Sequence, residues 1–291
     1  MKGFMEKFRK FLKIPNDFSV KGWHKISYID WGNPNCDKVI FCVHGLSRNA
    51  QDFDYLALEL QDKFRIIAID IVGRGLSSWH EDKTMYNYAN YVADCQYLLE
   101  NLNISKVIWL GTSMGGIIAM QLFANNNNLI EKLILNDIGT FLPGKALTRV
   151  TSYVSKKQEF VNLYDAQKAL ATKLQTFGIS NKEHMQYLYE ISIVKNNFGK
   201  YVFNYDPEII KTPNKSIELP DIDLEYLWKN INIPVLLLRG KKSDIFLKQN
   251  AEEMKMSKIN IDLVEFDNVG HAPALMDKMQ IKVIKDWLDG C

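Results

Sequence analysis

The segment Gly111-Thr112-Ser113-Met114-Gly115 has the residue types of a nucleophilic serine on a tight turn. It lies between an apolar run at 106–110 and a helical pattern over 114–124. A G-x-S-x-G sequence in that setting lifts the serine hydroxyl above a sheet, and the crowded turn requires small neighbours. A helix that begins at Met114 would direct its first amides and its positive dipole end at this hydroxyl. We therefore predict that Ser113 is a nucleophile rather than a structural serine.

A serine hydroxyl is a weak nucleophile at neutral pH and needs a neighbouring base. His271 follows the last apolar β-like run, at 260–266. Parallel strands place their C-terminal loops along one edge of a sheet, where ligands bind, so His271 is expected near Ser113. We predict that His271 is the base and that activity falls in acid as it protonates. Three other histidines are interpreted as structural: His24, His80 and His184.

The imidazole in turn needs a carboxylate that holds its tautomer and stabilises the imidazolium. Asp244 follows the apolar run at 234–239, and one helix and one strand fit between it and His271. Asp137, at the end of the apolar run 130–135, is the alternative; its other role would be to cap the turn that follows. We predict that Asp244 is the acid.

The developing oxyanion of an acyl transfer needs hydrogen-bond donors. One is expected to be the backbone N–H of Met114, directly after the nucleophile. The second is expected from the loop Val43-His44-Gly45-Leu46-Ser47, where Gly45 lets the backbone turn inward and present the N–H of Leu46. The alternative for this loop is an ordinary turn at the end of a strand.

The elements that must position these residues follow from the apolar pattern. Short apolar runs without polar alternation, typical of strands buried on both faces, alternate with helical patterns from residue 38 to about 140 and resume at 234. This alternation predicts a doubly wound, mostly parallel α/β sheet. Residues 141–220 show helical patterns and many aromatic side chains. We therefore expect a core of residues 20–140 and 221–291 with a helical cap, 141–220, inserted into it.

Residues 1–19 form a separate N-terminal segment. Within residues 1–13, apolar side chains recur at helical spacing opposite basic ones, and Pro15 would end the helix. The helix could lie on a membrane surface, but we favour a helix docked on the body or a frayed end.

Composition excludes several classes of function. The chain has 291 residues, 47% of them hydrophobic, and a net charge of +2, which gives no case for a nucleic-acid partner. Its four cysteines form no C-x-x-C pair, and we expect neither a metal nor a disulfide. The glycine-rich stretch at 70–77 lacks the third glycine of a dinucleotide site and is interpreted as a structural turn. With no secretory signal, the expected location is cytoplasmic.

Taken together, these residues resemble the α/β-hydrolase superfamily. The matching pieces are His44-Gly45, the turn at 70–77, Gly111-x-Ser113-x-Gly115-Gly116, Asp244 and Gly270-His271. The resemblance is to small bacterial esterases, lactonases and C–C hydrolases of meta-cleavage type, and it implies an α/β-hydrolase fold, a Ser-His-Asp triad and no cofactor. A serine at position 113 excludes the related branches that use an aspartate nucleophile.

The predicted function is hydrolysis of a carboxylic ester, lactone or thioester through an acyl-enzyme. The substrate is expected to be a small acyl compound, apolar or aromatic if the cap aromatics line its pocket rather than form the cap's own core. Two alternatives are hydrolysis of a C–C bond by the same triad and a non-catalytic ligand-binding protein on the same fold.

Overall fold

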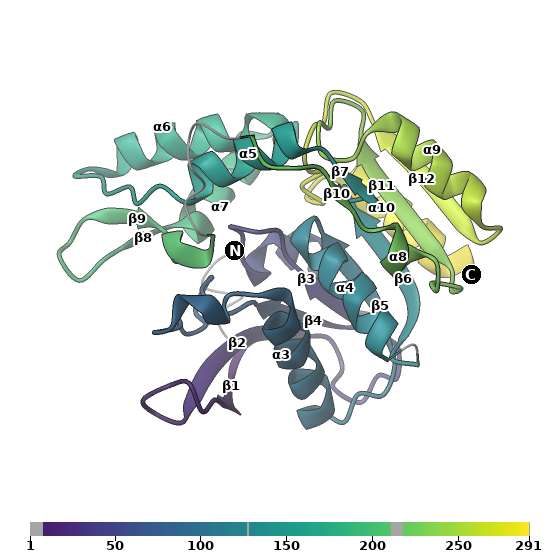
Figure 1. Cartoon of the computed structure of the whole chain (residues 1–291), viewed down its shortest axis with the longest axis horizontal. Helices are drawn as coiled ribbons and strands as arrows, with labels where there is room; N and C mark the ends of the chain where they lie inside the picture. Colours follow the sequence, from purple (N-terminus) through teal and green to yellow (C-terminus); the bar gives the residue numbers. More distant parts are fainter. Residues whose placement is uncertain (1–7, 127, 211–217, 291) are drawn as a thin grey trace.

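The computed structural model describes residues 8–126, 128–210 and 218–290. Its centre is an eight-stranded sheet in the order β1-β2-β4-β3-β5-β6-β11-β12 (Figure 1). β1 pairs with β2 and β2 with β4 antiparallel, and the other pairs are parallel. The strands are β1 (Arg9–Pro15), β2 (Trp23–Trp31), β3 (Val39–Val43), β4 (Arg65–Asp70), β5 (Val107–Thr112), β6 (Ile130–Asn136), β11 (Val235–Gly240) and β12 (Ile261–Phe266). The predicted mostly parallel α/β sheet is confirmed.

Helices cover both faces of this sheet, which explains the unbroken apolar runs. Phe41 and Val43 of β3 share a core cluster with four helices: α3 (Tyr88–Asn101), α4 (Met114–Asn125), α8 (Glu225–Trp228) and α9 (Lys248–Ser257). Ile40 and Cys42 of the same strand belong to a second cluster, with α2 (Asp54–Leu60) and α10 (Lys278–Gly290). Successive side chains of a strand point to opposite faces, so a strand between two helical layers is apolar at every position.

The prediction of a helix near the N-terminus is wrong for the part that the structure describes. Residues 9–15 form β1, an edge strand paired with β2 from Arg9↔Ile29 to Pro15↔Trp23. Arg9 donates to the carboxylate of Asp70 at 2.6 Å, so its charge is buried in an ion pair rather than presented to solvent. Residues 1–7, which carried the rest of that expectation, lie outside the described residues.

The segment predicted as a cap, residues 141–220, lies between β6 and β11. It holds α5 (Gly144–Val154), α6 (Leu163–Leu174) and α7 (Lys182–Ser192), and the short antiparallel pair β8 (Ile193–Lys195) and β9 (Tyr201–Phe203). Figure 1 shows these elements together beside the core sheet. β7 (Phe141–Leu142) pairs with β10 (Ile222–Asp223), so the chain leaves and re-enters the core at one two-stranded stem. The cap has its own cluster of buried apolar residues, as a separately packed layer requires.

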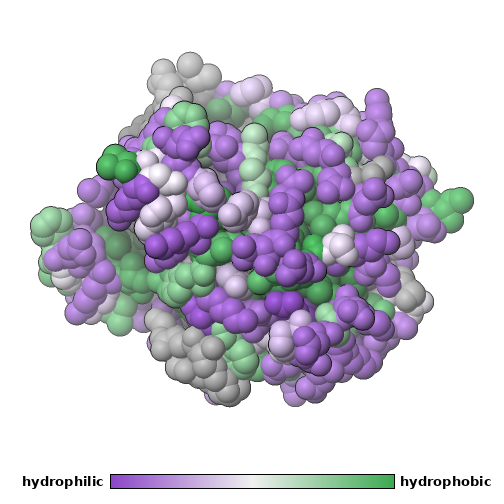
Figure 2. Space-filling model, turned by 90° about the horizontal axis from the view of Figure 1, so that it is seen from below, coloured by the Kyte–Doolittle hydropathy of each residue, from purple (hydrophilic) through white to green (hydrophobic). Residues whose placement is uncertain are grey.

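One face of the molecule is mostly hydrophilic, with hydrophobic residues in scattered groups (Figure 2). No helix in the described ranges combines the length and the apolar character needed to cross a bilayer. Three of the cysteines, Cys36, Cys42 and Cys95, are free thiols; the fourth, Cys291, lies outside the described residues.

Candidate active site

Ser113 occupies a strained turn between β5 and α4. Its φ is 51° and its ψ is −113°, a conformation that an L-residue rarely adopts. A Cβ on Gly115 would lie 2.1 Å from the carbonyl oxygen of Val43, and one on Gly111 would lie 2.4 Å from the Gly115 backbone. Only glycine fits at these two positions, because the turn packs backbone directly against backbone. The local sequence therefore produces the sharp turn on which Ser113 was predicted to lie.

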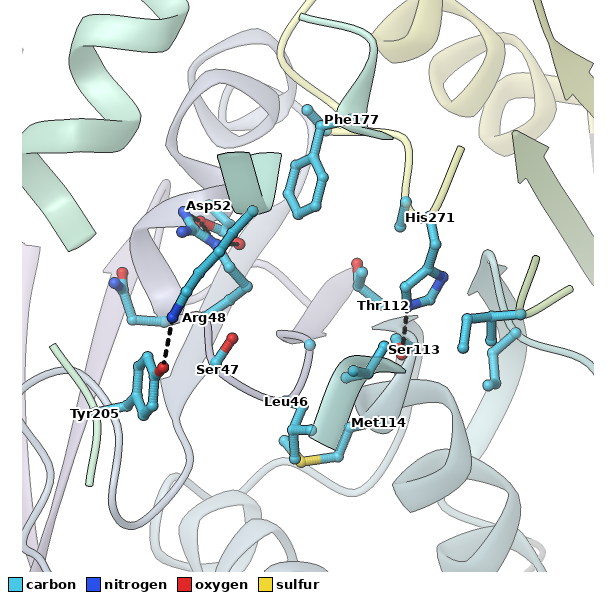
Figure 3. Close-up of a pocket in the computed structure, with 18 of the residues that line it drawn as sticks. Leu46, Ser47, Arg48, Asp52, Thr112, Ser113, Met114, Phe177, Tyr205 and His271 are labelled. Atoms are coloured by element: carbon cyan, nitrogen blue, oxygen red, sulfur yellow. Dashed lines mark hydrogen bonds and ion pairs between the residues drawn. The ribbon is translucent and has the colours of Figure 1, made fainter. Parts of the chain in front are cut away.

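A hydrogen-bonded relay joins Ser113, His271 and Asp137. His271 Nε2 lies 2.9 Å from Ser113 Oγ, the contact drawn as a dashed line in Figure 3. His271 Nδ1 lies 2.8 Å from Asp137 Oδ2. An ionised carboxylate can only accept, so Nδ1 carries the proton and the lone pair of Nε2 faces the serine hydroxyl. This is the tautomer in which an imidazole can accept the proton of Ser113.

Asp137 follows β6 with a φ of 55°, and its side chain is fully buried. Its Oδ1 accepts the N–H of Gly240 at 2.8 Å, and its Oδ2 accepts the hydroxyl of Ser243 at 2.5 Å in addition to the imidazole. Both donors come from the end of β11 and the turn after it. Three hydrogen bonds stabilise a charge that would otherwise be costly to bury, and they fix the direction in which it faces His271.

The prediction that Asp244 is the partner of His271 is wrong. The Asp244 side chain is about half exposed and forms a two-point ion pair with Arg149 of α5, at 2.7 Å for both contacts. Ser243, the residue before Asp244, is the one that contacts the site, through its hydrogen bond to Asp137. Asp137, the alternative at the end of the neighbouring strand, makes the contact, because β6 lies between β5 and β11 in the sheet and so ends close to both loops.

The two predicted oxyanion residues lie together at the site. Met114 is the first residue of α4, whose N–H has no acceptor within the helix. Figure 3 shows Leu46 and Met114 side by side near Ser113, and all three line one cavity. Gly45 lies next to them, with its ideal Cβ position 3.8 Å from Ser113 Cβ.

Arg74, which sequence reasoning missed, connects these two residues. Its guanidinium is fully buried and donates to the carbonyl of Leu46 at 2.8 Å and to the sulfur of Met114 at 3.5 Å. It also donates to the carbonyl of Val72 and the hydroxyl of Tyr91. The only signal in the sequence was an arginine inside a glycine-rich turn at the end of β4.

His44 holds the same loop from the other side. Its Nε2 accepts the N–H of Ile71 at 3.0 Å, so its Nδ1 carries the proton and donates to the carbonyl of Gly45 at 2.7 Å. Complete burial lowers the pKa of His44 to about 4, so the ring stays neutral at physiological pH. His44 thus holds the backbone of the loop directly before Leu46.

The relay opens into a cavity of about 360 Å³ between the core and the cap. Most of its wall is apolar and comes from α4, α5, α6 and the loops at the strand ends. Its charged members are Arg48, Asp52 and Lys173, with His271 at one end. Arg48 and Asp52 form a tight ion pair and so cancel each other's charge. A cavity of this kind can enclose a small, largely apolar ligand with its reacting carbon near Ser113.

In the described ranges no group of three histidine, cysteine, aspartate or glutamate side chains is arranged to hold a metal ion. The chemistry that this arrangement can perform with its own groups is nucleophilic attack by an activated hydroxyl.

Comparison with known proteins gives matches over nearly the whole chain. The model of the alpha/beta hydrolase fold family matches residues 38–277. A 3-hydroxybutyrate-oligomer hydrolase of Cupriavidus necator is 33% identical over 280 residues, which are 94% of this chain and 95% of that protein.

Two crystal structures share the complete architecture. A protein from Rickettsia typhi matches with a TM-score of 0.90 and 37% identity, over 97% of this chain and 99% of that one. An alpha/beta hydrolase from Novosphingobium aromaticivorans matches with a TM-score of 0.84 and 27% identity, over 98% and 99%. These similarities extend over the core and the inserted cap alike.

Proposed function

This chain belongs to the α/β-hydrolase fold family, and on that premise we propose that it is a serine hydrolase that cleaves carboxylic esters through an acyl-enzyme. The observation that carries the proposal is the relay Ser113–His271–Asp137, with contacts of 2.9 and 2.8 Å, of which Ser113 and His271 line a largely apolar cavity.

The proposed reaction follows from the direction of these hydrogen bonds. Ser113 Oγ attacks the ester carbonyl carbon while its proton moves to His271 Nε2. The backbone N–H groups of Leu46 and Met114 donate to the oxyanion of the tetrahedral intermediate. The intermediate collapses as the imidazolium gives its proton to the departing alkoxide, which leaves as an alcohol. A water molecule then attacks the acyl-enzyme by the same steps and releases the carboxylic acid and free Ser113.

Asp137 acts through His271 rather than on the substrate. Its carboxylate keeps the proton on Nδ1 and stabilises the positive charge that the imidazole acquires during attack. Gly240 and Ser243 hold the carboxylate in that position.

The substrate class that we propose is an ester of a short hydroxy acid, as in an oligomer of 3-hydroxybutyrate. The name of the Cupriavidus necator relative supports this class, and so does a cavity whose wall is mostly apolar and whose volume suits a small acyl group. Lactones and thioesters present the same carbonyl to the same relay.

The proposal is tested by labelling with a fluorophosphonate, which reacts with an activated serine. The wild type and Ser47→Ala are expected to be labelled, because Ser47 lines the same cavity without contacting His271. Ser113→Ala is expected to lose both labelling and hydrolysis of the 3-hydroxybutyrate trimer. Equal labelling of Ser113→Ala and wild type would refute Ser113 as nucleophile.

A further inference from the structure

Lys173 is a positively charged side chain that lies among aromatic rings in the wall of the cavity. It lies in the last turn of α6 in the cap, and it lines the same cavity as Ser113. Its ammonium lies 4.0 Å from the centre of the Phe203 ring and also faces the rings of Tyr153 and Tyr205. Three aromatic rings therefore lie close to one positive charge, and the face of such a ring, here that of Phe203, attracts a cation.

The hydrogen bonds of Lys173 leave it incompletely satisfied. Nζ donates to the carbonyl of Tyr153 and to the hydroxyl of Tyr205, both at 3.2 Å. Figure 3 shows the Tyr205 hydroxyl that accepts the second of these bonds. An ammonium has three donors, and the described residues provide acceptors for two of them. The hydroxyl of Tyr205, having accepted from Lys173, can donate its own proton to the same ligand.

No carboxylate of the described residues pairs with Lys173. Arg48, the other cation of the cavity, is already neutralised by Asp52. The charge of Lys156 acts on Lys173 and repels it. Burial lowers the pKa of Lys173 to about 8, so the group is still mostly charged at pH 7. The described residues that line the cavity thus have a net charge of about +1 next to an apolar wall, and an anion that enters balances this charge.

We propose that Lys173, together with the hydroxyl of Tyr205, binds a carboxylate of the substrate, so that this enzyme prefers esters that carry a free carboxylate over the corresponding uncharged esters. The inference rests on the proposed ester hydrolysis and adds the charge of the substrate to it. The carboxylate replaces the missing counter-charge, and the third ammonium proton and the phenol proton become its hydrogen-bond donors.

The test compares each acid with its own methyl ester. The linear dimer of 3-hydroxybutyrate carries the carboxylate on the alcohol side of the scissile bond, and mono-p-nitrophenyl glutarate carries it on the acyl side. For each pair the ratio of kcat/KM for the acid to that for its methyl ester is measured at pH 7. Wild type is expected to give a ratio of about 10 or more for at least one pair, the size of one charged hydrogen bond.

Three variants make the test specific. Lys173→Met removes the charge at similar length and is expected to lower the ratio to about 1, whereas Lys173→Arg is expected to restore most of it. Lys168→Met removes an exposed lysine from the same helix and is expected to keep the wild-type ratio. The wild-type ratio should also fall between pH 7 and 9.5 as Lys173 loses its proton, and this fall should be absent in Lys173→Arg.

A wild-type ratio near 1 for both pairs, or an unchanged ratio in Lys173→Met, overturns the role of Lys173 while ester hydrolysis itself stands. Failure to hydrolyse any of the four compounds would instead overturn the proposed function. In that case calorimetric titration of Ser113→Ala with the dimer and with its methyl ester still decides the inference. Equal affinity for the two compounds would contradict it.

Discussion

Replacement of Asp137 by asparagine separates the two candidate acids. In the wild type, the Gly240 N–H requires an acceptor at Oδ1. The amide oxygen of the introduced asparagine is therefore expected to face Gly240, which turns its NH₂ group towards His271 Nδ1. Nδ1 must then accept, so the imidazole proton moves to Nε2 and points at Ser113. In that tautomer the base cannot take the proton of the serine hydroxyl.

The expected loss of kcat follows from this change of the His271 tautomer. In serine proteases the same substitution lowers kcat about 10⁴-fold with the geometry intact, which corresponds to about 5.4 kcal/mol in the activation free energy. We expect a loss of the same order in Asp137→Asn. Asp244→Asn removes only an exposed ion pair with Arg149, worth about 0–1 kcal/mol of stability. We expect its kcat to stay within about twofold of wild type.

The assay is steady-state hydrolysis of p-nitrophenyl butyrate, with thermal unfolding as the control for folding. Asp137→Asn should unfold cooperatively, because asparagine has the shape of aspartate. A kcat within tenfold of wild type for Asp137→Asn would refute the reasoning. So would a thousandfold loss in Asp244→Asn with its melting temperature unchanged.

Two further predictions concern stability. Gly115→Ala should lower the free energy of unfolding by about 3 kcal/mol or more, because its Cβ would lie 2.1 Å from the Val43 carbonyl oxygen; Gly290→Ala, which meets no atom within 4 Å, is the control in urea unfolding. Burial raises the pKa of Asp54 to about 7, and its carboxylate accepts the hydroxyl of Tyr187 from the cap. Because the folded state holds this proton more tightly than the unfolded state, stability should fall as pH rises from about 4 to about 7. Asp54→Asn should remove that part of the decline. Tyr187→Phe should lower the free energy of unfolding by about 1–3 kcal/mol at pH 8, because the ionised carboxylate of Asp54 loses its hydrogen-bond donor. Equal unfolding free energies of Tyr187→Phe and wild type at pH 8 would contradict this.

The alternation of apolar runs was sufficient to predict the parallel part of the sheet, because strands buried on both faces have no polar positions. It was also sufficient to place Ser113 and His271 at strand ends on one edge. The apolar pattern does not contain the information that decides between Asp137 and Asp244 as the partner of His271. Both follow strands that end at this edge, and only the direction of each side chain separates them.

The N-terminal strand shows a second limit of the pattern. Apolar residues at helical spacing near the N-terminus predicted a helix, but β2 offers residues 9–15 a row of backbone partners, and the ion pair of Arg9 with Asp70 adds to this pairing. Tertiary pairing overrides local periodicity in a segment this short.

Arg74 lies between the two glycines of the turn at 70–77 without being one of its defining residues, and Lys173 belongs to no motif. Each acquires its role from residues distant in sequence: Arg74 from Leu46 and Met114, and Lys173 from Tyr205. Single cations of this kind are found only when the structure brings their partners together.

The position of Asp137 has a consequence for how this molecule can diversify. Ser113 and Asp137 are encoded in one continuous stretch that ends before the stem formed by β7 and β10. Recombination at that stem would exchange the whole cap, including Lys173. Ser113 and Asp137 would still come from the same parent gene. Asp244 contacts α5 through an exposed ion pair with Arg149, and a new cap can lose that pair at little cost in stability. Substitutions in the cap, which contributes part of the cavity wall, can therefore accumulate while Ser113 and Asp137 stay unchanged.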